Sequence, residues 1–421
     1  MTTLRRLAIL GIGLVGLAGA AAPAHALPAF ARKYGMKCTA CHESWPVLNA
    51  VGRAFRDNGF RFNNGRDNET LTDPGYWPIF SWNWTGYQAN EKKSADAVLN
   101  KTGGITTDVW IIGAAASLGE HISVRVFAPL VVGNGPSTFA APVAGWLRYN
   151  RLFNTEWLNV SVGNLEQDLP IEGFRDFSVN GVGSTLWSYV IPGSVSSYSP
   201  ENDVQGIEIM GHDRGSTNRY SVTFFSNEGA FATHHDFWST PSVFGHVTHT
   251  FQLPSSFVRD VEVGVFGAYT TWGVGHDSTS LRAQKRYGVD VSEWLFNDAL
   301  PLHLTEAWEQ GRDDAGLIAG ATRDGVFNAY MFQADYVPAL SFVIFGRASF
   351  ITTQQQAVAT QTGAYGNQNI FLLGFKYSYQ ITTRFGVAIE PSYGLNLAAH
   401  GAPDGTNLQT HQFYIPLEVV F

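Results

Sequence analysis

From about residue 78 onward, the chain alternates between apolar and polar residues with a period of two, in segments of roughly ten residues. Residues 383–393 show the pattern, with one apolar face (Phe385, Val387, Ile389) and one more polar face (Ala388, Glu390, Ser392). Alternation with this period predicts β-strands that separate an apolar environment from a polar one.

The last segment alternates in the same way up to the terminal phenylalanine. One face holds Phe413, Ile415, Leu417, Val419 and Phe421, and the other holds Gln412, Tyr414 and Glu418. This ending resembles the C-terminal signal that the outer-membrane assembly machinery reads, so we expect it to be the last strand of a barrel.

The connections between these segments are alternately short and long. Short turns are expected near Gly119-Glu120, Asn154-Thr155, His212 to Thr217, Pro254-Ser255, Ala299-Leu300, Pro338-Ala339 and Ile381-Thr382. Long loops are expected near 91–103, 134–141, 167–202, 229–241, 273–283, 313–325, 353–367 and 397–410. Seven turns and eight loops join 16 antiparallel strands, with 14 or 18 as alternatives because segment 167–202 could hide or lose a pair. Both ends of such a sheet lie on the short-turn side, which in outer-membrane barrels faces the periplasm.

The composition agrees with an all-β transmembrane barrel. Only 15% of residues are charged, 14% are aromatic and 44 are glycine, and beyond the N-terminal leader no apolar run approaches 18 residues. A soluble β-propeller or sandwich is the alternative fold, but the chain shows no blade repeat. The net charge of −8 argues against nucleic acid and anionic lipid surfaces as partners. The barrel itself implies outer-membrane lipid as its surroundings.

Residues 1–26 have the pattern of a secretory signal peptide. Arg5 and Arg6 precede an apolar core from Leu7 to about Ala20, and residues 24–26 form a small-x-small cleavage site. The mature chain is therefore expected to begin near Leu27, outside the cytoplasm.

Both cysteines of the chain lie in Cys38-Thr39-Ala40-Cys41-His42. This spacing is typical of c-type haem attachment, in which two thiols bind one haem and the following histidine is the proximal iron ligand. A redox-active cysteine pair or disulfide is the first alternative. A zinc site is the second, but it would need two more ligands elsewhere, and no second cysteine pair exists. Export favours the haem interpretation, because c-type haem is attached outside the cytoplasm.

Residues 27–77 form a unit in front of the barrel, which spans 78–421. The unit is too short to bury a core alone, and a haem can substitute for part of one. A helix is predicted from Trp45 to about Asn58, where Leu48, Val51 and Phe55 recur at helical spacing and could cover one haem face. We expect this unit to be a small plug in or under the periplasmic mouth of the barrel.

Residues 28–35 (PAFARKYG), the haem motif and residues 52–60 (GRAFRDNGF) together resemble the fused monohaem cytochrome–porins of the outer membrane, best known from iron-oxidising bacteria. The resemblance is specific over about 35 residues, and the order of signal, haem motif and barrel agrees with it. It implies single-electron transfer from an extracellular donor, Fe(II) in the known members, through one haem to a periplasmic cytochrome or copper protein. This chain departs from the iron-oxidising members at Tyr34, where they carry threonine, and here it is closer to relatives with no assigned donor.

The sixth iron ligand is the most open question. Between His42 and His121 the sequence has no histidine or methionine, so the plug itself offers Met36, Lys33, Lys37, Tyr34 or the new amino terminus. Met36 stands only two residues before Cys38, which makes the far face of a haem awkward to reach. Strand parity places four further candidates in the barrel lumen: Met210, His212, His121 and Met331.

Four arginines fall on the polar parity of their strands: Arg125, Arg148, Arg219 and Arg347. Because a guanidinium binds a carboxylate in a bidentate manner, one or two of them could hold the haem propionates. Arginines also line many porin lumens without such a role.

On the outer side, Thr233-His234-His235-Asp236 and the segment Glu306 to Asp314 carry groups that could bind Fe(II) transiently. Two further function classes stay open besides iron oxidation. One is a redox conduit for another extracellular donor or acceptor, and the other is a solute porin with an accessory haem domain. An Fe(II)-oxidising oxidoreductase is the only enzyme class considered, since no nucleophile elbow, phosphate loop or metalloprotease motif is present.

Overall fold

The computed structural model describes residues 28–68, 79–94, 97–132, 135–136, 144–171, 186–196, 198–201, 203–226, 241–253, 257–273, 281–295, 301–353, 367–382, 385–399 and 407–420. The predicted signal peptide, residues 69–78, the terminal Phe421 and most of the predicted long loops lie outside this range. No helix among the described residues is long and apolar enough to cross a membrane.

Residues 28–68, called here the N-terminal segment, contain α2 (Pro28–Tyr34), η1 (Cys38–Ala40), α3 (Ala50–Asp57) and η2 (Gly65–Asn68). The helix predicted from Trp45 is shorter than expected at its start. α3 begins after Asn49, whose side chain accepts a hydrogen bond from the Gly52 amide at 2.9 Å. This is an N-cap, which supplies a partner for an amide that has none within the helix.

The rest of the described chain is mostly strand. The strands are β1 (Ile79–Ser94), β2 (Ala97–Ser117), β3 (Ile122–Val132), β4 (Gly135–Pro136), β5 (Ala144–Tyr149), β6 (Asn159–Leu165), β7 (Val204–His212), β8 (Asn218–Ser226), β9 (Pro241–Gln252), β10 (Val258–Gly273), β11 (Leu281–Leu295), β12 (Leu302–Asp313), β13 (Gly325–Ala339), β14 (Phe342–Thr353), β15 (Gln368–Thr382), β16 (Phe385–Ile389), β17 (Ser392–Ala398) and β18 (Leu408–Val420). Three short 3-10 turns lie in the connections: η4 (Leu152–Asn154), η5 (Leu186–Ser188) and η7 (Ala315–Leu317).

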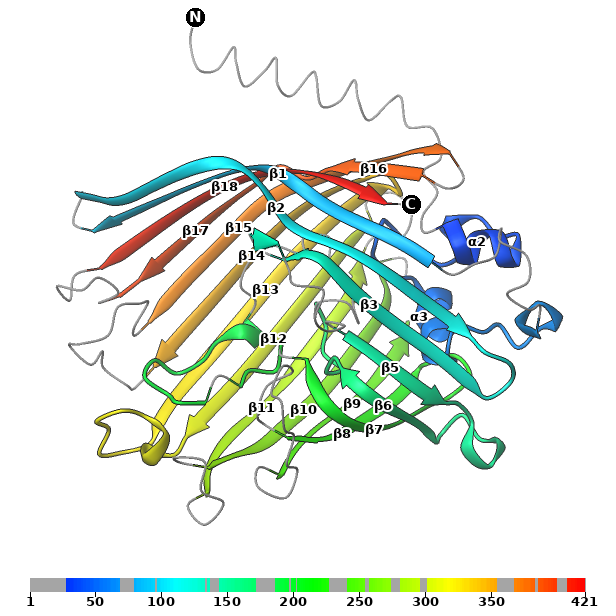
Figure 1. Ribbon diagram of the computed structural model, residues 1–421, viewed down its shortest axis with the longest axis horizontal. Helices are drawn as coiled ribbons and strands as arrows, with labels where there is room; N and C mark the ends of the chain where they lie inside the picture. The colour runs from blue at the N-terminus through cyan, green and yellow to red at the C-terminus, as the bar shows by residue number, and fades with distance from the viewer. Residues whose placement is uncertain are drawn as a thin grey trace, which may run out of the picture.

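These strands form one closed antiparallel barrel (Figure 1). β4 and β5 both pair with β3, and β16 and β17 both lie between β15 and β18. Pro391, which has no amide hydrogen to donate, separates β16 from β17. Counting each interrupted pair as one strand gives the 16 strands that the sequence predicts, and pairing of Trp82 with Val420 joins β1 to β18.

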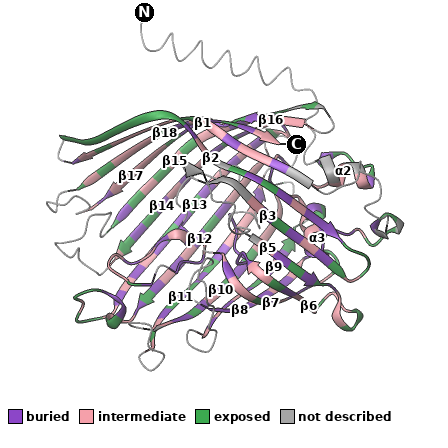
Figure 2. Ribbon diagram, viewed as in Figure 1, coloured by how far each residue is buried: buried purple, intermediate pink, exposed green. Residues whose placement is uncertain are grey.

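The two faces of the sheet differ as the alternation predicts (Figure 2). Large apolar side chains such as Ile207, Val247 and Leu417 are exposed on the outer face. The intervening residues point into the barrel and are buried, among them Glu208, Thr248 and many other polar groups. An apolar exterior over a buried, mixed interior is the arrangement of a lipid-facing barrel.

Several predicted connections need correction. The loop expected at 91–103 is strand, because β1 runs to Ser94 and β2 starts at Ala97, with Glu91 opposite Lys101. Residues 91–94 are polar on both faces, and Val98 and Leu99 are adjacent apolar residues, so the alternation that marks the other strands is missing here. The turns expected near Pro338 and Ile381 follow β13 and β15, which extend through Ala339 and Thr382.

The turns expected at Gly119-Glu120, Asn154-Thr155 and His212 to Thr217 are found where predicted, although His212 itself ends β7. Those near Pro254 and Ala299 lie outside the described residues.

The N-terminal segment lies at the short-turn end of the barrel, near the end of β18 (Figure 1). Lys33 Nζ lies 3.3 Å from Ser117 Oγ at the end of β2, the Trp45 amide donates to Leu340 O in the turn after β13, and Arg61 donates to Glu120 O in the turn after β2. Because these partners stand on different sides of the barrel, the segment spans its mouth.

Candidate functional site

The cysteine motif forms a compact turn. Cys38–Ala40 is a single 3-10 turn, and Cys38 O accepts hydrogen bonds from the amides of Cys41 (3.0 Å) and His42 (2.9 Å). The two thiols are not joined by a disulfide. The turn therefore brings both sulfur atoms and the imidazole to one place without crosslinking them.

The His42 ring is fixed in one tautomer. Its Nδ1 lies 3.1 Å from Pro46 O, and because a carbonyl only accepts, Nδ1 carries the proton. Nε2 is then the nitrogen with a lone pair for a metal, an arrangement common for metal-binding histidines. Burial lowers the pKa of His42 to about 4, so the ring is neutral at pH 7.

The Cys41 thiol is protonated at pH 7. Burial raises its pKa to about 11, with a further contribution from Cys38. Cysteine pairs that exchange disulfides depend on a lowered thiol pKa.

A cavity of about 1050 Å³, part of it open to solvent, lies directly against this motif. Cys38, Cys41 and His42 all line it, together with aromatic residues of the N-terminal segment and of β3: Phe30, Tyr34, Trp45, Phe55, Phe60, Phe62 and Phe127. Small-molecule and cofactor sites are mostly apolar with a few placed polar groups, and the residues that line this cavity have that composition.

The apolar wall of the cavity is a cluster of packed rings. Phe30 of α2 packs on Phe55 of α3 with ring centroids 5.0 Å apart, and Phe60 stacks on Phe30 at 5.3 Å. Phe60 also stacks on Trp146 of β5 at 5.9 Å. The rings therefore join the two helices to each other and to the barrel.

Tyr34 lines the cavity but has a structural set of contacts. Its hydroxyl lies 2.8 Å from Asp67 Oδ1 and 3.0 Å from Phe60 O. Burial, followed by the hydrogen bond to Asp67, raises the pKa of Tyr34 well above its usual value. The phenol therefore stays protonated and ties α2 to residues 60–67.

α3 approaches the motif very closely at Gly52. A Cβ on this residue would lie 2.1 Å from Cys41 O and 2.9 Å from a Leu48 methyl. Leu48 and Phe55 line the cavity as predicted, whereas Val51 is 47% exposed and does not.

A buried charge cluster holds α3 to the barrel wall. Asp57 Oδ1 accepts from Arg56 Nε at 2.9 Å, and Arg219 Nη1 of β8 lies 3.7 Å from Asp57 Oδ2. The His212 ring contacts Asp57 O at 3.1 Å. Burial alone would raise the pKa of Asp57, but Arg56, Arg219 and His212 hold it well below its usual value.

Asp57→Asn is expected to loosen the N-terminal segment strongly. The amide removes the carboxylate charge that Arg56 and Arg219 share, while Arg219 keeps its contacts with Asp168 and Glu262. Breaking a buried pair costs about 3 kcal/mol. Limited proteolysis of the segment should therefore be about a hundredfold faster. Glu43→Gln, which removes a more exposed pair with Arg259, is the matched control and should change the rate little.

The same cluster predicts a pH dependence. Because the pKa of Asp57 is lowered in the folded protein, its contribution is complete above the ordinary aspartate pKa of about 3.9 and declines as the pH falls further. Protease sensitivity should rise below about pH 4, and rise less in Asp57→Asn. An equal acid response in both proteins would contradict this assignment.

A second anchor joins the motif to the last strand. The Trp45 ring packs against His42 with centroids 5.3 Å apart, and Trp45 Nε1 donates to Glu418 Oε1 of β18 at 3.2 Å. Lys376 Nζ lies 2.5 Å from the other Glu418 oxygen. The position of His42 is thus coupled to the strand that closes the barrel.

Trp45→Phe keeps the ring and removes the N–H donor. We expect the N-terminal segment to lose about 1 kcal/mol of docking stability, seen as roughly fivefold faster limited proteolysis. Trp157→Phe, at a half-exposed tryptophan in the turn between β5 and β6, is the control. Equal rates in both variants would show that the Glu418 contact is not an anchor.

Of the five sulfur and imidazole candidates for a distal ligand, Met36 alone lines the cavity. Met210 and Met331 are buried inside the barrel, as strand parity predicts, but away from the cavity. His212 contacts Asp57, and His121 lies in the turn after β2 with Nδ1 3.2 Å from Asn150 O. Strand parity correctly placed Met210, His212 and Met331 on the inner face of the barrel. The structure does not, however, bring any of these four side chains to the cavity beside Cys38, Cys41 and His42.

The four predicted arginines are all buried inside the barrel, and one of them, Arg125, lines the cavity. Its Nη1 lies 2.9 Å from Glu166 Oε2. Arg148 and Arg219 contact Glu208 and Asp168, and Arg347 Nε donates to Gln333 at 2.8 Å. Each of the four arginines predicted from strand parity therefore contacts a carboxylate or an amide inside the barrel.

Lys37 and Arg56 also line the cavity. The sequence argument considered Lys37 only as an iron ligand and did not identify Arg56. Arg56 directly follows Phe55, which was predicted to face the haem. This neighbouring position in the sequence could have identified Arg56 as a cavity residue.

The structure describes only one of the two segments expected to bind Fe(II) on the outer side. Residues 233–236 lie outside the described chain. Glu306 to Asp313 belongs to β12 rather than to a loop, and its inward acids are engaged by Arg286, 2.7 Å from Asp313 and 3.7 Å from Glu309. Among the described residues, no cluster of three or more His, Cys, Asp or Glu side chains is arranged to bind a metal ion.

Comparison with known proteins relates the chain to outer-membrane porins by structure. No family model matches the sequence, and no curated protein does. OprB of Pseudomonas putida superposes with a TM-score of 0.53 at 11% identity, over 81% of this chain and 94% of that one. The anion-selective porin from Comamonas acidovorans gives 0.52 at 11% identity, over 82% and 99%. The chain therefore has the 16-strand barrel fold seen in outer-membrane porins, with an additional N-terminal segment set in its short-turn end.

Proposed function

We propose that the N-terminal segment binds one c-type haem and that the protein transfers single electrons across the outer membrane. The observation that carries this proposal is the convergence of both thiols, the His42 ring and an apolar cavity of about 1050 Å³ at one place. Haem supplies one-electron redox chemistry, tuned by its axial ligands and its burial. Cys38 and Cys41 would hold it covalently, and His42 Nε2 would be the proximal ligand.

The cavity also carries cationic groups suited to the two haem carboxylates. Lys37, Arg56 and Arg125 line it, and guanidinium groups bind carboxylates strongly. For the distal position the proposal is Met36, because it lines the same cavity. Arg148, Arg219 and Arg347 are not part of this proposal.

The porin-like fold suggests how the protein sits in the membrane. Outer-membrane barrels face lipid with their apolar band and turn their short connections to the periplasm. The N-terminal segment would then face the periplasm, where a soluble cytochrome or copper protein accepts the electron. Residues 28–68 contain seven Lys and Arg but only three Asp and Glu. This excess of positive charge favours a partner with an acidic docking surface.

The donor proposed is extracellular Fe(II), from the resemblance of residues 28–60 to the iron-oxidising cytochrome–porins. The test is stopped-flow spectroscopy of the haem band in sealed outer-membrane vesicles, with Fe(II) added on the outer side. Reduction by Fe(II) supports the donor. A haem band that dithionite reduces and Fe(II) does not would overturn the iron assignment and leave a conduit for another donor.

A solute porin with an accessory haem unit is the second candidate. The fold likeness to an anion-selective porin favours it, as do the arginines inside the barrel. Conductance of the reconstituted protein separates this candidate from a closed electron conduit.

A further inference from the structure

We infer that the connection between β6 and β7 is a second internal plug, and that it makes this barrel a sealed scaffold rather than a solute channel. Its described residues, called here the inner loop, are 166–171, 186–196, 198–201 and 203. The inference depends on the protein core alone and not on whether a haem is bound.

The inner loop crosses the full width of the barrel. It leaves β6 at Leu165 and returns to β7 at Val204, residues that pair with each other. In the ring of 16 strands, β14 stands directly opposite β6, and η5 of the inner loop contacts both β13 and β14. A segment that starts at one wall and packs against the opposite wall must pass through the lumen.

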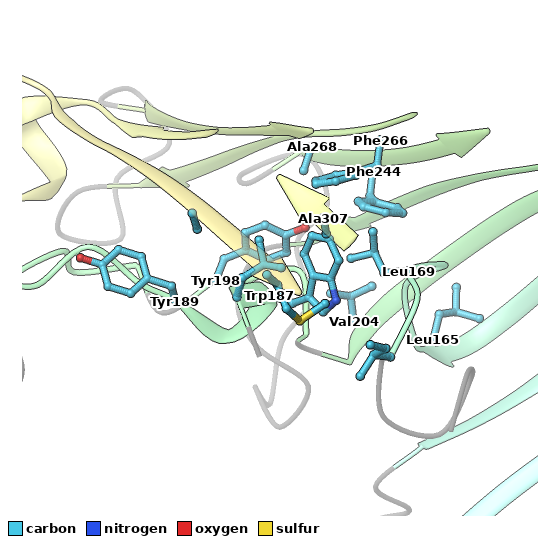
Figure 3. Packing of buried hydrophobic residues seen from close by; sticks show 14 of the residues in the cluster. Leu165, Leu169, Trp187, Tyr189, Tyr198, Val204, Phe244, Phe266, Ala268 and Ala307 are labelled. Atoms are coloured by element: carbon cyan, nitrogen blue, oxygen red, sulfur yellow. The ribbon is translucent and has the colours of Figure 1, made fainter. Parts of the chain in front are cut away.

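Three aromatic residues of the inner loop, Trp187, Tyr189 and Tyr198 (Figure 3), pack against three different parts of the wall. Ring centroids lie 5.2 Å apart for Trp187 and Phe266 of β10, 4.7 Å for Tyr189 and Phe327 of β13, and 5.5 Å for Tyr198 and Phe225 of β8. Trp187 has no exposed surface, and neither do Leu186 and Ile191 beside it. These side chains occupy space that water fills in a conducting porin.

Hydrogen bonds hold the inner loop in this position. Trp187 Nε1 donates to Pro170 O at 2.8 Å, and Ser196 Oγ donates to Gln284 of β11 at 2.5 Å. The Val195 amide donates to Leu317 O at 2.7 Å, so the inner loop is also bound to the connection between β12 and β13. These bonds tie the inner loop to β11 and to the connection between β12 and β13.

The inner loop and the N-terminal segment belong to one apolar core. Phe60, Trp146, Leu165, Leu169 and Trp187 are members of the same buried cluster. Porin lumens are polar and water-filled, whereas inward polar groups of this barrel such as Glu208, Thr248 and Arg286 have almost no surface accessible to water. The cluster reaches from the N-terminal segment to Phe266 of β10 and Phe327 of β13, and we infer that it closes the lumen.

The first test is the conductance of the intact protein in planar lipid bilayers. Insertion is verified separately by the heat-dependent shift in electrophoretic migration. The inference predicts no channel steps. Stepwise ionic conductance from the intact chain would overturn it, whether or not haem is present.

The second test measures access to the wall beneath the inner loop. Thr270 of β10 has no exposed surface, and its Oγ1 donates to the same Gln284 oxygen as Ser196. In Thr270→Cys, a membrane-impermeant thiol reagent should leave position 270 unlabelled, as judged by peptide mass mapping. Ala319→Cys, exposed on the neighbouring connection, is the control that labels readily. Labelling of position 270 as fast as position 319 in the intact chain would overturn the inference.

Replacing residues 169–201 with a short glycine-serine linker completes the second test. A short linker suffices because Leu165 and Val204 are paired across the hairpin. In this background, position 270 should label at the rate of position 319. If the barrel folds and position 270 stays protected, the inner loop is not the element that seals it. If the replacement does not fold, the labelling rates of positions 270 and 319 in the intact chain decide whether the inference holds.

Discussion

Cys38→Ser combined with Cys41→Ser is expected to yield a barrel that folds but carries no covalently bound haem. A serine hydroxyl does not add to a vinyl group as a thiol does, so the attachment is lost at both positions. None of the barrel's strand pairs involves these residues, and the apolar exterior does not depend on them. The purified variant should show no haem stain after denaturing electrophoresis, while its heat-dependent migration matches that of the parent.

The same variant should release the N-terminal segment to proteases. The aromatic side chains that line the cavity lose their proposed occupant, and apolar surface left without packing partners weakens the docking of the segment. Thr39→Ser, between the two cysteines and exposed, is the matched control and should keep the haem. Haem that survives denaturation in the double variant would contradict the assignment.

Gly52→Ala is expected to prevent stable docking of α3 against the haem motif. In an ordinary helix this change is stabilising by about 0.5–1 kcal/mol, because glycine loses more backbone freedom on folding. Here the added Cβ would lie 2.1 Å from Cys41 O, a backbone atom that cannot rotate away. Overpacking of this kind costs about 1–3 kcal/mol, so the sign of the effect reverses.

The measurement for Gly52→Ala is haem content per barrel together with the protease sensitivity of residues 28–68. Both should worsen, in the direction opposite to helix propensity. Val51→Ala, one position earlier on the exposed side of the same helix, is the control and should change neither. Equal or improved haem content in Gly52→Ala would show that α3 does not sit against the motif as described.

The barrel could be predicted from the sequence because strand alternation is a local signal. Each inward or outward assignment needs only the parity of a short segment, which is why Met210 and Met331 were placed inside the barrel correctly. The prediction failed where the alternation is absent, because Glu91 and Lys101 lie in stretches without a period of two and their strands still pair.

The composition of the cavity could be predicted only in part. Cys38, Cys41 and His42 are adjacent in sequence, so their convergence follows from one turn. Which inward side chain reaches the cavity depends on how deeply the N-terminal segment enters the barrel, and this depth is set by long-range contacts such as Asp57 with Arg219. No local pattern reports such contacts.

The inner loop was expected only as a long connection. Its residues include Leu169, Ile171, Leu186, Trp187 and Ile191, which are too apolar for a solvated loop. That composition was a signal for burial inside the barrel, because exposed loops rarely carry such a run.

The most direct test of the central claim is the intact mass of the purified native protein after full denaturation. The account predicts the mass of the exported polypeptide plus one haem, with the added mass mapped to the peptide containing Cys38 and Cys41. A mass equal to the bare polypeptide, or to the polypeptide less two hydrogen atoms, would instead indicate a dithiol or a disulfide and contradict it.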